Sequence, residues 1–209
     1  MVDQFLEIFN YIHEKLSNYD IKREEILVHS RKIVRSCSVT IKHVHRKEFN
    51  EAEELLSGIR NDLSKLSPIQ EDSINTENNI NVAFQEYVEA LTFYQFATHR
   101  EIFKPKEDQT IPLIAYLHGL CDLVGELRRF SLDHLKETSD FFEAERAMLF
   151  MEDIYNNLLT LDYPSGLITG IRRKTDLARN IVEKTRGDLV LAYNRGKIEE
   201  KIKEFLEKK

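Results

Sequence analysis

Residues 82–96 of the 209-residue chain read VAFQEYVEALTFYQF. Apolar side chains cover most of the circumference of a helix with this sequence, so most of that helix is expected to be buried. The helix nevertheless carries Glu86 and Glu89, which lie about 60° apart at the α-helical rotation of about 100° per residue. Glu89 shares a narrow polar stripe with Gln85 and Thr92. A carboxylate pair on a buried helix needs a positively charged partner.

A second apolar helix, predicted at residues 112–135, repeats this arrangement. Its polar stripe contains Asp122 and Glu126, which are about 40° apart on a helix. The same stripe contains Gly119 and Gly125, each about 0.8–1.0 kcal/mol less favourable than Ala in a helix interior. Close approach of another helix or of a ligand would compensate for that cost.

Two apolar helices that each carry a carboxylate pair can converge on one divalent cation. Carboxylate oxygens are ligands that suit Mg²⁺ or Mn²⁺. The alternative is that each pair lies on a solvated stripe, or that a nearby arginine neutralises it, the candidates being Arg100, Arg128 and Arg129. Spacing alone leaves both interpretations open, because acidic pairs are common on helices.

Helical periodicity extends along the rest of the chain. Helices are expected at about residues 5–44, 48–66, 77–102, 112–135, 139–159 and 167–193. The first is either one long helix or two with a joint near residues 18–20, and the last is expected to be interrupted near Gly187 and to end at Arg195-Gly196. Residues 67–73, 104–110 and 162–166 read as loops.

Composition excludes several classes of protein. Gly (7) and Pro (4) are too scarce for the many turns of an all-β fold. No apolar run reaches the roughly 18 residues of a membrane span, and the first residues lack the pattern of a secretory signal. Cys37 and Cys121 do not form a CxxC motif, so a reducing, cytoplasmic setting is expected.

Charge is high and mixed, with 30 basic and 36 acidic residues and a net charge of -6. This balance gives no bulk attraction to nucleic acid, so such a partner needs a local basic patch. One candidate patch is a stripe whose spacings of four, seven and four residues put its members on one face of the first helix: Arg31, Arg35, Lys42 and Arg46. The stripe can bind phosphates, or it can be a solvated face paired with acidic neighbours such as Glu24 and Glu25. The same two interpretations apply to the cluster Arg172-Arg173-Lys174.

Residues 84–93 (FQEYVEALTF) and 116–127 (YLHGLCDLVGEL) resemble the two motif helices of the translin family, and of its translin-associated factor X (TRAX) branch in particular. Weaker agreements follow in the expected order at Ser30-Arg31, Thr40-Ile41, His45-Arg46 and Arg195-Gly196. The resemblance therefore covers nearly the whole chain up to Gly196.

This resemblance implies an all-α, single-domain bundle of about seven helices that assembles into a hollow, octamer-like shell around single-stranded nucleic acid. In TRAX-like subunits, carboxylates on the inner surface hold Mg²⁺ and cleave RNA. Carried over residue by residue, they are Glu86, Glu89, Asp122 and Glu126. Plain translin subunits bind RNA without cutting it and lack most of this set.

The expected function is therefore a Mg²⁺-dependent endoribonuclease acting on single-stranded RNA, with Mn²⁺ as an alternative cation. Arg31, Arg35, Lys42 and Arg46 would hold the RNA backbone. Arg129 would steady the phosphate or, alternatively, pair with Glu126 or Asp133. The competing hypotheses are a non-catalytic oligomer that binds single-stranded RNA or DNA, and a structural or regulatory bundle whose carboxylates only neutralise basic residues.

The chain departs from the TRAX pattern in three places. The insertion between the motif helices is reduced to residues 104–110, a basic N-terminal extension is absent, and residues 197–209 match no part of the family pattern. We therefore expect a translin-like domain at residues 1–196, followed by a charged amphipathic helix or tail at 197–209. The short chain predicts a homo-oligomer, specifically a homo-octamer, that needs no separate translin subunit.

Overall fold

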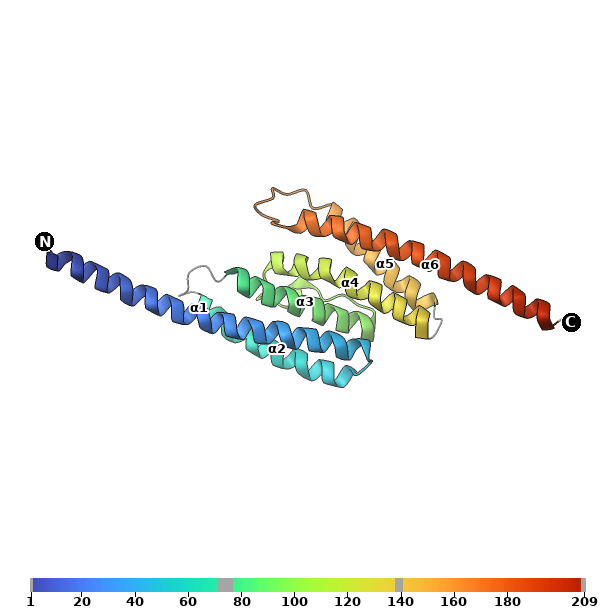
Figure 1. Ribbon diagram of the computed structural model, residues 1–209, viewed down its shortest axis with the longest axis horizontal. Coiled ribbons are helices and arrows are strands. Elements are labelled where there is room, and N and C mark those ends of the chain that lie inside the picture. The colour runs from blue at the N-terminus through green and yellow to red at the C-terminus, as the bar shows by residue number, and fades with distance from the viewer. Residues whose placement is uncertain (1, 71–76, 138–140, 208–209) are drawn as a thin grey trace. The chain divides into compact units, whose positions relative to one another are not determined.

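The structure is a computed structural model that describes residues 2–70, 77–137 and 141–207. The described residues form six α-helices and one short 3-10 helix, with no strand (Figure 1), so the expected all-α fold class is confirmed. They are α1 (Val2–His45), α2 (Phe49–Gln70), α3 (Glu77–His99), η1 (Pro105–Glu107), α4 (Leu113–Glu137), α5 (Phe141–Leu159) and α6 (Ile171–Glu207). The chain divides into two compact units, Met1–Gly119 and Leu120–Lys209.

In the first unit, α1, α2 and α3 lie side by side and contact one another (Figure 1). Four consecutive residues of α3, numbers 87–90, are all buried. Because consecutive residues point about 100° apart on a helix, this helix is covered on all sides. The burial expected from the apolar sequence of this segment is therefore confirmed.

The ends of two helices in this unit differ from the prediction. The helix α2 continues through Gln70, so the beginning of the expected loop at 67–73 is helical, and its remainder lies outside the described residues. The helix α3 ends at His99 rather than Ile102. Arg100 adopts a left-handed backbone conformation with φ 62°, and its guanidinium donates hydrogen bonds to the carbonyls of Phe96 and Ala97. These bonds satisfy carbonyl groups that a helix end leaves without partners.

The first half of α1 extends past α2 and α3 (Figure 1). The helix is continuous, without the joint considered near residues 18–20. Its apolar side chains are exposed, with Phe5 at 60% and Leu16 at 55% of their full accessibility. In the described residues, no helix has the length and hydrophobicity that a membrane span requires.

In the second unit, α5 and α6 pack along each other. Each buries side chains at intervals of three or four residues, which form one stripe per helix: Ala144, Ala147, Met151, Ile154 and Leu158 on α5, and Ile171, Thr175, Ala178, Val182 and Thr185 on α6. Hydrogen bonds join residues 120–137 of α4 to this pair. Ser131 Oγ donates to the carbonyl of Ala144 (3.0 Å).

The helix α6 is longer than predicted. It runs without interruption through Gly187 and Gly196 to Glu207, so the break expected near Gly187 and the end expected at Arg195-Gly196 are wrong. A glycine lowers helix stability by about 1 kcal/mol, and an ion pair one turn apart, from Arg195 Nε to Glu199 Oε1 (3.0 Å), supports the helix at the second glycine. Residues 197–207 therefore continue α6, and they expose an apolar face that includes Ile198 and Phe205.

Gly119 allows α4 to approach α3 closely within the first unit. A Cβ atom at this position would lie 2.7 Å from the backbone oxygen of Gln85 and 2.8 Å from Cβ of Val88. Both distances are shorter than van der Waals contact, so the close approach expected for Gly119 is present. Gly125 is different, because a Cβ atom there would meet no atom of the described residues within 4 Å outside its own stretch of helix. Close approach of another helix is therefore wrong as an explanation for Gly125, and the alternative of a ligand stays a prediction.

Replacement of the two glycines by alanine should change stability in opposite directions. Gly119→Ala is expected to lower the free energy of unfolding by about 1–3 kcal/mol, because the new methyl group meets backbone that must shift. Gly125→Ala should raise it by up to about 1 kcal/mol through helix propensity. Urea unfolding followed by circular dichroism measures both, and a stable Gly119→Ala variant would contradict the close α3–α4 approach.

Candidate metal and nucleic-acid site

Glu86 and Glu89 lie on α3 in the first unit, on the side that faces Cys37 of α1. Glu89 is only 9% exposed, and Glu86 is half-buried. Burial raises the pKa of the Cys37 thiol, and the negative charges of Glu86 and Glu89 raise it further. Both carboxylates are therefore close enough to Cys37 to act on it electrostatically. No spacing pattern in the sequence indicated that Cys37 lies there.

Thr92, one turn after Glu89, adds a hydroxyl oxygen to the polar stripe of α3. The residue is fully buried, and Thr92 Oγ1 has no hydrogen-bond partner among the described residues. Buried polar atoms in proteins nearly always have a partner, which is frequently an ordered water or an ion. This stripe therefore presents carboxylate and hydroxyl oxygens in a covered environment.

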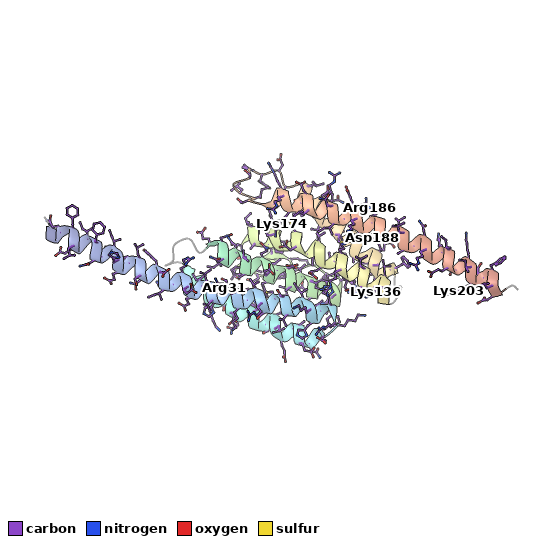
Figure 2. All side chains as sticks on the ribbon, viewed as in Figure 1. Arg31, Lys136, Lys174, Arg186, Asp188 and Lys203 are labelled. Carbon is purple, nitrogen blue, oxygen red and sulfur yellow. The ribbon has the colours of Figure 1, made fainter. Side chains whose placement is uncertain are left out.

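Asp122 and Glu126 lie on α4 in the second unit, where both are half-buried. Lys174, near the start of α6 (Figure 2), donates hydrogen bonds to both carboxylate oxygens of Asp122, at 2.8 Å to Oδ1 and 2.6 Å to Oδ2. Lys174 belongs to the basic cluster at residues 172–174, for which phosphate binding and pairing with acidic residues were the two interpretations. For Lys174, the structure shows the pairing.

The three arginines considered as neutralising partners each bind other groups. Arg100 caps the end of α3. Arg128 donates to Thr185 Oγ1 and Asp188 Oδ2 on α6, at 2.8 and 2.7 Å. The third is Arg129, whose Nε lies 3.7 Å from Oδ2 of Asp133. This is the ion pair that was expected as the alternative to phosphate binding.

The donor chemistry of these residues fits Mg²⁺ or Mn²⁺. In the described parts of the chain, no three His, Cys, Asp or Glu side chains are grouped so that they could hold a metal ion. Mg²⁺ commonly uses only one or two protein carboxylates and completes its shell with water and substrate phosphates. The pair on α3, with the Thr92 hydroxyl beside it, and the pair on α4 each offer such hard oxygen ligands. That all four carboxylates share one cation stays a prediction.

The basic stripe faces solvent: Arg31, Arg35 and Lys42 lie on α1, and Arg46 follows directly after the helix ends at His45. All four members, Arg31, Arg35, Lys42 and Arg46, are exposed. Within residues 2–70, 77–137 and 141–207 they form no ion pair, so the alternative pairing with Glu24 or Glu25 is not observed. Neighbouring Lys32, by contrast, pairs with Asp62 at 2.7 Å. The stripe therefore offers positive charges that can bind an anion; Figure 2 labels Arg31.

Comparison with known protein sequences gives a consistent result. The Translin family profile matches residues 21–186. Uncharacterized protein MJ0175 of Methanocaldococcus jannaschii is 35% identical over 199 residues, which cover 95% of this chain and 88% of that protein. The Translin-associated protein X homolog of Schizosaccharomyces pombe is 24% identical over 208 residues, which cover 90% of this chain and 86% of that protein.

Solved structures resemble this chain over most of its length. AfC3PO is 32% identical with a TM-score of 0.81, and AfC3PO in complex with duplex RNA is 31% identical with a TM-score of 0.80. Each alignment covers 90% of this chain and 97% of the other. Apo-NeC3PO, at 23% identity and a TM-score of 0.79 over 88% of this chain and 96% of its own, shares the fold.

Cys37 and Cys121 should be unreactive in the folded protein. Burial raises the pKa of both thiols, for Cys121 to about 12. At pH 8 roughly one thiol in 10⁴ would then be the reactive thiolate at a pKa of about 12. Iodoacetamide followed by mass spectrometry should label neither cysteine in the folded protein and both in guanidinium chloride. Rapid labelling of Cys37 without denaturant would contradict the covered environment of Glu86 and Glu89.

Proposed function

The chain belongs to the translin family, and we propose that it is a metal-dependent endoribonuclease. The observation that carries this proposal is that both motif helices keep acidic side chains within a buried or half-buried apolar surface. Burial of such groups costs free energy and gives no benefit to packing. Their presence on this surface is therefore better explained by a chemical role than by stability. The four are Glu86, Glu89, Asp122 and Glu126.

In this proposal the four carboxylates hold the cation and leave part of its coordination shell for water and for phosphate oxygens. When bound, Mg²⁺ would lower the pKa of a water and polarise the scissile phosphate. The protein contributes a covered surface on α3 and a fixed orientation of Asp122, which Lys174 holds by both oxygens. Arg129 lies on α4 beside Glu126, and its exposed guanidinium, whose Nε pairs with Asp133, is the proposed ligand of the phosphate.

RNA is the proposed substrate, and the exposed basic stripe of α1 is its proposed binding surface. The stripe carries positive charge that no acidic residue in the described parts of the chain neutralises. The relative AfC3PO has been solved with duplex RNA, which supports RNA as the class of ligand. Our proposal is cleavage of single-stranded RNA, so the test includes both forms.

Self-association is the third part of the proposal, with a homo-octamer as the expected assembly and the cytoplasm as its location. Exposed apolar surface supports the association. Large apolar side chains are exposed on the first half of α1 and on the last turns of α6, and such faces are typical of surfaces that another protein covers. A stable monomer in native mass spectrometry would contradict this part.

Removal of one carboxylate should abolish cleavage without abolishing RNA binding. Fluorescently labelled single-stranded and duplex RNA are each incubated with Mg²⁺ or with excess EDTA. Glu89→Gln and Asp122→Asn are expected to lower kcat about 10³-fold, since the cation supplies several kcal/mol of transition-state stabilisation. Binding of RNA should change by less than about threefold, because neither residue is part of the basic stripe.

Glu54→Gln is the matched control, because Glu54 is an exposed carboxylate on α2. It should cleave like the wild type. Undiminished cleavage by both carboxylate variants, or by the wild type in EDTA, would contradict the metal-dependent mechanism. Salt-sensitive RNA binding without any metal-dependent product would identify a non-catalytic binding protein instead.

The basic stripe should control the salt dependence of RNA binding. The double variant Arg31→Gln and Arg35→Gln removes two exposed charges, and each lost phosphate contact changes the slope of log K against log salt by about 0.7 for single strands. We therefore expect the slope to fall by about 1.4. The control variant, Lys104→Gln with Lys106→Gln, removes equal charge elsewhere in the first unit. An equal effect of both double variants would show that only net charge matters.

A further inference from the structure

Lys174 and Asp122 form a half-buried ion pair within the second unit. The side chains are 24% and 30% exposed, and the ammonium lies 2.6 Å from Oδ2 and 2.8 Å from Oδ1. Figure 2 labels Lys174 near the start of α6. Both carboxylate oxygens thus accept a hydrogen bond from the same ammonium.

This geometry places the ammonium where a cation ligated by Asp122 would bind. A divalent cation can reach the same oxygens only if Lys174 moves aside or gives up one oxygen. Two cations on one carboxylate also repel each other, and a half-buried site screens that repulsion less than bulk water does. The pair therefore lowers the affinity of Asp122 for a divalent cation, and an exposed lysine elsewhere on α6 would have no such effect.

We propose that Lys174 is a positioning residue of the metal site. Lys174 serves as the counter-ion of Asp122 until a divalent cation replaces the ammonium. This inference rests on the proposed function in one respect, namely that Asp122 is a metal ligand. Lys174 keeps the carboxylate oriented and charged in the metal-free protein. Once displaced, its ammonium would be available to a phosphate, because a lysine ammonium is a common ligand of phosphate.

The first test measures Mn²⁺ affinity by electron paramagnetic resonance, with the full-length protein and without RNA. Lys174→Met is expected to bind Mn²⁺ about tenfold more tightly, because Asp122 loses its competing partner. The control Lys184→Met removes the same charge from an exposed position on the same helix and should leave the affinity unchanged. Asp122→Asn should remove the gain when it is combined with Lys174→Met.

The second test follows RNA cleavage at saturating metal, where differences in metal affinity no longer contribute. Lys174→Met should lower kcat with little change in KM, and Lys174→Arg should retain more of the activity because it keeps the positive charge. A merely structural ion pair predicts lower stability in urea with unchanged Mn²⁺ affinity. If Lys174→Met does not unfold cooperatively, Lys174→Gln takes its place in both measurements.

The outcomes separate this inference from the proposed function. Cleavage by the wild type, together with equal Mn²⁺ affinities of the wild type and Lys174→Met, would overturn the role of Lys174 and leave the ribonuclease intact. No cleavage by the wild type, together with tighter Mn²⁺ binding by Lys174→Met, would overturn the ribonuclease and support the exchange at Asp122. A wild type and a Lys174→Met variant that both bind no Mn²⁺ would overturn both.

Discussion

Burial of Glu89 constrains the packing of the first unit. The apolar residues of α3 require that the helix be covered on all sides, and α1 and α2 contribute to that cover. Glu89 is carried into the interior by the same packing and keeps only 9% of its accessibility. Transfer of an ionised carboxylate out of water costs several kcal/mol even after the protein relaxes. The fold must therefore supply compensating interactions there.

The second unit meets a related constraint in a different way. Asp122 is 30% exposed, so it retains part of its hydration, and a lysine supplies the compensating charge. That lysine comes from α6, whose position is fixed by its buried stripe and by the hydrogen bonds of Arg128 to Thr185 and Asp188. Packing of the apolar stripe and orientation of the carboxylate are thus linked, because the same helix contributes to both.

The sequence predicted what depends on local spacing. Composition indicated the burial of α3, helical periodicity placed both carboxylate pairs, and the helix cost of Gly119 indicated a close contact that is found at Gln85. It could not predict what depends on residues distant in the chain. Lys174 is 52 residues from Asp122, and no periodicity relates two positions so far apart. Cys37 next to the α3 pair was missed for the same reason.

Errors at helix ends have a simple physical cause. A glycine costs a helix about 1 kcal/mol, and each side-chain pair one turn apart contributes about 0.2–0.5 kcal/mol, so several favourable interactions together can maintain a helix through a glycine. Gly196 is helical because residues on both sides continue the helix and pair across it, as Arg195 does with Glu199. Arg100, which is not a glycine, ends α3 because its own side chain binds the last carbonyls.

The formal net charge of -6 is a poor guide to what this protein binds, because charges act over a limited distance. At physiological ionic strength, screening reduces interactions beyond about 8 Å. The basic stripe from Arg31 to Arg46 spans about 22 Å at 1.5 Å per residue. Phosphates spread along this face therefore each interact mainly with the nearest of the four exposed basic side chains, and acidic residues farther away contribute little. Buried Glu89 counts fully in the net charge but presents almost no surface to an approaching phosphate.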